Sequence, residues 1–120
     1  MTLHTLSSGS QGNCLLLSDG GTHILVDAGI STRRIKVGLA QLELSMDELD
    51  GILITHEHTD HISGLATLIK HHAVPLYASP GTARQLAYRI AGIESLLRPV
   101  EPGTVFSVGD CREQRLAYLT

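Results

Sequence analysis

The sequence has few cysteines and no long apolar run. Its two cysteines, Cys14 and Cys111, are too few and too far apart for a disulfide framework, so we expect free thiols. No apolar stretch approaches the roughly 18 residues that a membrane-spanning helix needs. Residues 1–5 have neither the basic start nor the apolar core of a signal peptide. These absences predict a cytoplasmic protein with no membrane partner.

The sequence also lacks an excess of positive charge. The formal net charge of −3 argues against nonspecific coating of nucleic acid, although it leaves room for a local basic rim. No repeat, linker or low-complexity tract divides the chain, and its hydrophobic content of 42% is ordinary for a folding protein. The 120 residues therefore indicate one small domain or part of one.

What the sequence does contain is a dense group of metal-binding side chains. Four of them, His56, His58, Asp60 and His61, lie within six residues directly after the apolar stretch 51–55. If that stretch continues as a strand, the first two imidazoles point to the same side about 6.5 to 7 Å apart and can converge on one ion. The aspartate and the third histidine follow where the chain turns into a helix, so they face the same metal site from its other side.

The types of these side chains point to a catalytic metal. Imidazole and carboxylate ligands suit zinc, manganese or iron. A bound divalent ion can lower the pKa of coordinated water from about 15.7 to about 7, which makes hydroxide available at neutral pH. The zincin motif His-Glu-x-x-His is excluded, because position 60 holds aspartate. The alternative is that the histidines are solvated and Asp60 only caps the next helix. We favour the metal site, because three histidines and an aspartate at this spacing seldom lack a role in metal binding.

These motifs resemble a known family. The pattern His-x-His-x-Asp-His after an apolar strand is similar to the signature of the metallo-β-lactamase superfamily, whose members are mostly dinuclear metal hydrolases. Within it, the segments 7–14, 24–31 and 52–65 resemble the WalJ (YycJ) group of bacterial proteins, which are regarded as metal-dependent nucleases acting from 5′ ends. The resemblance runs from about residue 3 to about residue 110. It implies an α/β fold, the N-terminal half of a metallo-β-lactamase-type αββα sandwich.

The resemblance also implies roles for single residues. His56 and His58 would bind a first divalent metal, zinc or manganese, and Asp60 and His61 would bind a second. Asp60 would also be the catalytic residue, and Asp27 would be a buried support for the ligand loop. The implied function is a metal-dependent hydrolase, a phosphodiesterase or DNA exonuclease in which metal-bound hydroxide attacks phosphorus. Its substrate would be a nucleic acid, DNA before RNA.

A second hypothesis is a noncatalytic truncated fragment or metal-binding module. Full-length members of the family supply a further histidine, a bridging aspartate and a last histidine from a second half, and the chain stops before any of them. It offers only about two ligands per ion, whereas a catalytic zinc usually has three protein ligands. We expect residues 1–110 to be the N-terminal half of the domain and residues 111–120 to be a divergent tail without strand alternation. An uncovered sheet would then favour self-association.

Hydrophobic periodicity predicts alternating strands and helices. One helix is expected over 31–42, and another begins at a Ser79 cap followed by Pro80 and stops near Gly92. A further helix follows the metal motif, and its expected apolar positions are Ile62, Leu65, Ala66 and Ile69. Strands are expected at 3–6, 14–18, 23–26, 52–54, 74–78 and 105–108, with a tight turn at 19–21.

Two further groups of residues are candidates for phosphate binding. Glycines among small hydroxyl residues before Cys14 can expose backbone N–H groups as an anion-binding nest. An ordinary connecting loop is the alternative for these residues, and both interpretations stay open. They are Ser8, Gly9, Ser10, Gly12 and Asn13.

The second group is a pair of arginines. Arg33 and Arg34 lie in the first turn of a predicted helix, where cations oppose the helix dipole at a cost of about 0.3 to 1 kcal/mol each. This placement is compatible with a phosphate-facing rim with Lys36 as a third member, but a solvated helix face is the interpretation that we favour. The remaining histidines have no partner motif and are assigned to structure or surface: His4, His23, His71 and His72.

Overall fold

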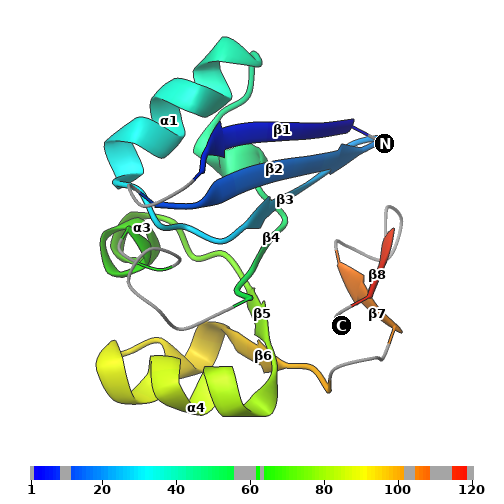
Figure 1. Ribbon diagram of the computed structural model, residues 1–120. Coiled ribbons are helices and arrows are strands. Elements are labelled where there is room, and N and C mark those ends of the chain that lie inside the picture. Colours follow the sequence, from blue (N-terminus) through cyan, green and yellow to red (C-terminus); the bar gives the residue numbers. More distant parts are fainter. Residues whose placement is uncertain are drawn as a thin grey trace.

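The main body of the chain is a six-stranded sheet with helices on one face (Figure 1). The computed structural model describes residues 2–8, 12–55, 62, 64–101, 105–108 and 115–118, the last two stretches by their backbone. The strands lie side by side in sequence order: β1 (Thr2–Ser7), β2 (Cys14–Asp19), β3 (Thr22–Val26), β4 (Gly51–Leu53), β5 (Leu76–Ala78) and β6 (Leu97–Pro99).

The first three strands are joined as antiparallel neighbours. Strand β2 ends at Asp19, which pairs with Thr22 of β3, so Gly20 and Gly21 form a two-residue turn. Gly20 has φ +63°, a left-handed conformation that glycine adopts without steric cost. The three strands and the turn confirm the sequence prediction, because alternation and a glycine turn are local signals.

From β3 onward neighbouring strands are parallel, so each connection crosses over the sheet. Figure 1 shows the three α-helices of these connections on the same side of the sheet. Two of the helices begin at serine caps, because Ser31 accepts a hydrogen bond from the Arg34 N–H and Ser79 accepts one from the Thr82 N–H. Of these two caps, the one at Ser79 was predicted. The helical elements are α1 (Thr32–Gln41), η1 (Met46–Glu48), α3 (Leu65–His71), α4 (Pro80–Arg89) and η2 (Glu94–Leu96).

The core lies between the sheet and these helices. Leu16, Leu25, Ile52 and Leu76 are direct neighbours across four strands, and all four are fully buried. Burial of one such side chain stabilises the fold by about 1.5 to 3 kcal/mol. They belong to one apolar cluster with the buried faces of the helices, which are formed by Ile35, Leu39, Leu65, Leu68 and Leu86.

Two details differ from the sequence prediction. Of the expected apolar positions, Ile62 and Leu65 are buried and Ile69 packs against the core, as predicted. The difference is at the fourth position, because Ala66 is exposed and Leu68 of α3 is buried instead. Strand β6 was not predicted, because three residues are too few to show alternation. Within the described residues, no helix is long and apolar enough to cross a membrane.

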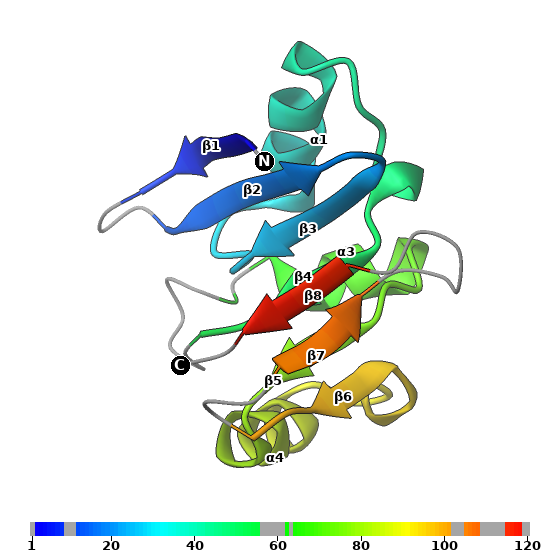
Figure 2. The same cartoon turned by 90° about the vertical axis from the view of Figure 1, so that its right-hand side faces the viewer.

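A separate two-stranded sheet follows the main body. Its first strand, β7 (Val105–Val108), was predicted, and it pairs antiparallel with β8 (Arg115–Tyr118). Figures 1 and 2 show this pair on the face of the larger sheet opposite the helices. The expectation of no strand within residues 111–120 is therefore wrong for β8, because backbone pairing forms a strand too short to show alternation. The domain boundary at residue 110 stays a prediction.

Candidate metal centre

The four predicted metal ligands, His56, His58, Asp60 and His61, lie outside the described residues. We call residues 56–61 the ligand segment. Its nearest described neighbours are Thr55 before it and Ile62 and Gly64 after it. Elsewhere in the described part of the chain, no group of three or more His, Cys, Asp or Glu side chains could hold a metal ion. The described part of the site therefore consists of the contacts that fix the two flanks of the ligand segment.

Asp27 holds the flank that precedes the ligand segment. Its Oδ1 accepts a hydrogen bond from the Thr55 N–H at 2.8 Å, and its Oδ2 accepts one from the Thr55 hydroxyl at 2.7 Å. The Asp27 N–H donates to the Leu53 carbonyl at 2.8 Å, which extends the contact between β3 and β4 past the ends of the strands. Both oxygens of one buried carboxylate thus orient the residue directly before His56.

The backbone of Asp27 is in an unusual conformation. Its φ of +64° lies in the left-handed region, which aspartate tolerates better than most residues because its short polar side chain can bond locally. Such a conformation persists where the surrounding contacts fix it, at a cost of order 1 to 3 kcal/mol. The hydrogen bonds to Thr55 and Leu53 supply those contacts. Strained backbone next to the carboxyl ends of parallel strands is common at functional sites.

The residues after Asp27 hold the other flank. The Gly64 N–H donates to the Ala28 carbonyl at 2.9 Å, and the Thr32 hydroxyl lies 3.5 Å from the Gly64 carbonyl oxygen. A Cβ added to Gly64 would lie 1.7 Å from the Ile30 carbonyl oxygen, so this close approach requires glycine. The stretch 27–32, which we call the 27–32 loop, therefore contacts both flanks of the ligand segment.

The serine-glycine loop packs against the same stretch. Gly12 has φ +115°, and a Cβ on it would lie 2.2 Å from the Gly29 carbonyl oxygen. The Gly29 N–H donates to the Asn13 carbonyl at 2.9 Å, and the Ser7 hydroxyl donates to the Gly12 carbonyl at 2.9 Å. Ser8 is exposed beside them. The other two phosphate-binding candidates of this loop, Gly9 and Ser10, lie outside the described residues.

Burial and nearby charge keep the thiol of the nearest cysteine protonated. Cys14 is fully buried and has a free thiol, as predicted. Burial first and the charge of Asp27 second raise the pKa of this thiol to about 12, and Arg34 partly offsets the two. Metals bind the thiolate, which this thiol does not form near neutral pH. Cys111, the other predicted free thiol, lies outside the described residues.

The whole sequence is similar to a known family and to known proteins. It matches the model of the metallo-beta-lactamase superfamily over residues 8–117. The chain belongs to the metallo-beta-lactamase superfamily. It is 39% identical over 114 residues to exodeoxyribonuclease YycJ of Bacillus anthracis, an alignment that covers 93% of this chain and 41% of that protein. It is also 44% identical over 77 residues to exodeoxyribonuclease WalJ of Streptococcus pneumoniae, which covers 64% of this chain and 29% of that protein.

Solved metallo-beta-lactamases share the fold. The Rm3 metallo-beta-lactamase superposes with a TM-score of 0.71 at 26% identity, covering 89% of this chain and 45% of the other. The SMB-1 metallo-beta-lactamase superposes with a TM-score of 0.72 at 20% identity, covering 88% and 46% of the two chains. The chain therefore spans less than half the length of the relatives and structures it matches. The α/β fold predicted from the sequence is confirmed, and the superfamily is one of metal-dependent hydrolases.

The residues of the predicted basic rim on α1 line two different surface hollows. Arg33 and Arg34 are exposed and line one surface hollow. Lys36 lines a different hollow with Asp47 and His72, so it does not share the hollow of the two arginines. Its place in a phosphate-facing rim stays a prediction.

Two of the four histidines assigned to structure or surface make structural contacts. His23 Nδ1 lies 2.7 Å from the Ser18 hydroxyl, and its backbone N–H donates to Asp50 Oδ2 at 2.8 Å. His72 Nδ1 lies 3.6 Å from Asp47 Oδ1. The sequence analysis did not identify Thr55, Thr32 or Gly64 as positioning residues. Their partners are 28 to 32 residues away or are backbone atoms, so no short motif could have indicated them.

Proposed function

We propose that this chain acts in metal-dependent hydrolysis of phosphodiester bonds in DNA, as an exodeoxyribonuclease. The observation that carries the proposal is the contact of the 27–32 loop with Thr55 and Gly64, which brackets a His-x-His-x-Asp-His segment. The printed names of the relatives YycJ and WalJ support the reaction and the choice of DNA. Metal ligands need this kind of support, because loss of one outer-shell partner typically lowers affinity or activity about 10 to 100-fold.

The ligand segment fits divalent metal ions by its chemistry. His56 and His58 would hold one ion, and Asp60 and His61 would hold a second, since imidazole and carboxylate together suit zinc or manganese. A bound ion would supply Lewis-acid activation of water and of the phosphoryl oxygen. Asp60, the carboxylate among the four, would accept a proton from the attacking water. Asp27 would remain outside this chemistry and keep Thr55, and through it the start of the segment, in place.

Metal content gives the first test. The wild-type chain should bind zinc or manganese, and His56→Ala/His58→Ala should bind less metal per chain. Binding at about a thousandfold above Kd should raise the free energy of unfolding by about 4 kcal/mol. The matched control is His71→Ala, which removes an exposed histidine at the end of α3 and should leave the metal content unchanged. Equal melting temperatures of the wild type in zinc, manganese and chelator would contradict the metal site.

Cleavage of DNA gives the second test. Metal-loaded chain should release nucleotides from the ends of 5′-phosphorylated DNA, and Asp60→Asn should abolish the release. The second candidate, a metal-binding module without catalysis, is favoured by the small number of ligands, about two per ion where a catalytic zinc usually has three. Full metal occupancy without DNA cleavage would select this module. Cleavage that the Asp60→Asn variant retains would contradict the role proposed for Asp60.

A further inference from the structure

A surface hollow runs along α1 beside strand β1. Its volume is about 510 Å³, and Ser31 at one end and Gln41 at the other show that it follows the helix for its whole length. Leu6 of β1 forms part of its wall opposite the helix. Gly38 makes room for this wall, because a Cβ there would lie 3.0 Å from a Leu6 methyl group. The cationic lining residues are Arg33 and Arg34. We call this feature the α1 hollow.

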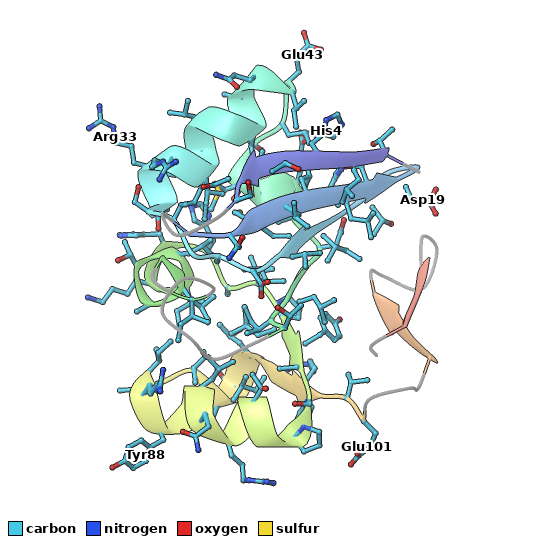
Figure 3. All side chains as sticks on the ribbon, viewed as in Figure 1. His4, Asp19, Arg33, Glu43, Tyr88 and Glu101 are labelled. Carbon is cyan, nitrogen blue, oxygen red and sulfur yellow. The ribbon has the colours of Figure 1, made fainter. Side chains whose placement is uncertain are left out.

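The charges of the α1 hollow are uncompensated. Helix α1 carries Arg33, Arg34 and Lys36 and no carboxylate, in a chain whose formal net charge is −3. No ion pair or side-chain hydrogen bond reaches either guanidinium within the part of the chain that the structure describes. Figure 3 shows Arg33 extending from the first turn of α1 into solvent, while Glu43 lies beyond the opposite end of the helix. Two neighbouring guanidiniums without acidic partners are complementary to a polyanion.

Three other hollows on the described surface lack this combination. The one that contains Lys36 also contains Asp47, and another pairs Arg84 with Glu94. A third holds Lys70 and Arg89 near the ends of α3 and α4, but Arg89 already has an interaction partner. The α1 hollow also shares Ser31 with the 27–32 loop, which contacts both flanks of the ligand segment.

We propose that the α1 hollow binds the sugar–phosphate backbone of the DNA strand that the candidate metal centre would cleave. This inference rests on the proposed function. Guanidinium groups suit phosphate, because their planar donors can form two parallel hydrogen bonds to its oxygens. Leu6 and Val37 contribute apolar surface, and no aromatic side chain lines the hollow on which a base could stack. The hollow therefore reads phosphates without regard to sequence, and its binding depends strongly on salt.

The test measures binding in EDTA, so that no cleavage is required. The probe is a short 5′-phosphorylated oligothymidylate with a 3′ fluorophore, titrated by fluorescence anisotropy at several salt concentrations. For single strands, each phosphate contact contributes about 0.7 to the slope of log K against log salt concentration. Arg33→Gln/Arg34→Gln should therefore lower the slope by about 1.4 and each single change by about 0.7. Both side chains are exposed, so these variants should keep the wild-type melting temperature.

The matched control is Lys36→Gln, which removes the same charge from the same helix but from a different hollow. It should change the slope by less than half of the effect of a single arginine substitution. An equal effect of the lysine and arginine variants would overturn the proposal in favour of diffuse attraction, as would failure of the wild type to bind the probe at low salt. If the chain binds the probe through the arginines but never cleaves DNA with metal, DNA binding by the α1 hollow would stand and the proposed hydrolase activity would be refuted. Metal-dependent cleavage by Arg33→Gln/Arg34→Gln with an unchanged KM would support the hydrolase and refute DNA binding by the α1 hollow.

Discussion

The two flanks of the ligand segment are held by different physics. Thr55, before the segment, is held by a buried carboxylate through two short hydrogen bonds of 2.8 and 2.7 Å. Gly64, after it, is held by one backbone hydrogen bond and by the absence of a side chain, which lets it approach the Ile30 carbonyl. One flank depends on polar attraction and the other on shape. A different kind of substitution should therefore destabilise each flank, although both flanks are held by the same loop.

The largest expected effect is on the flank that depends on shape. Gly64→Ala would place a Cβ 1.7 Å from the Ile30 carbonyl oxygen, and a backbone atom cannot swing aside as a side chain can. We expect a loss of at least about 3 kcal/mol in the free energy of unfolding, measured by urea denaturation. The matched control is Gly81→Ala, since nothing lies within 4 Å of a Cβ there. In helix α4 this change should stabilise by about 0.5 to 1 kcal/mol. Similar stabilities of the two variants would show that the approach to Ile30 imposes no constraint.

The next effect is on the flank that depends on polar attraction. Asp27→Ala removes both acceptors of Thr55 and leaves alanine at φ +64°, so we expect a loss of about 2 to 3 kcal/mol. Asp27→Asn keeps one acceptor oxygen and tolerates the same backbone conformation, so its loss should be about 1 kcal/mol. Metal affinity should fall in the same order, because the start of the ligand segment is less well positioned. If alanine and asparagine cost the same, the two hydrogen bonds are not what holds Thr55.

The two flanks also differ in how far the sequence predicts them. Asp27 was assigned a supporting role through the family resemblance, but its partner Thr55 is 28 residues away, and no local pattern links them. The steric role of Gly64 depends on a carbonyl of another segment, which only the folded chain brings close. By contrast, the caps at Ser31 and Ser79 and the Gly20 turn were predictable, because their partners lie within three residues. Arg34 and Lys36 line different hollows although they are close in the sequence, and no local pattern indicated this difference.

A titration can report the charge that holds the Thr55 flank. The folded state raises the pKa of Cys14 from 9.0 to about 12, by burial first and the charge of Asp27 second. Below about pH 9 the thiol is mostly neutral in both the folded and the unfolded state, so it has little effect on stability. Above that pH only the unfolded thiol ionises, so stability falls by about 1.4 kcal/mol per pH unit until the folded pKa is reached.

The check compares wild type with Cys14→Ala by urea denaturation between neutral pH and pH 10. At pH 10 the wild type should have lost about 1.4 kcal/mol more than the variant, relative to neutral pH. Asp27→Asn should lower the pKa of the thiol, seen as faster alkylation of Cys14 at alkaline pH, because one of the two raising effects is gone. Identical pH dependence of wild type and Cys14→Ala would show that the thiol ionises freely in the fold.

The smallest effect is expected at the one polar side-chain contact on the Gly64 flank. The Thr32 hydroxyl lies 3.5 Å from the Gly64 carbonyl oxygen, longer than the usual 2.7 to 2.8 Å for such a bond. The same carbonyl also accepts the Leu68 N–H at 3.1 Å, so it keeps a partner when the hydroxyl is removed. Thr32→Val should therefore cost under about 0.5 kcal/mol, whereas Thr55→Val, which removes a 2.7 Å bond to a carboxylate, should cost about 1 to 1.5 kcal/mol. The two substitutions are chemically identical, so urea denaturation of both variants compares the flanks directly. A Thr32→Val loss as large as that of Thr55→Val would mean that both flanks depend on polar attraction, and that the glycine at position 64 only makes room for a hydrogen bond.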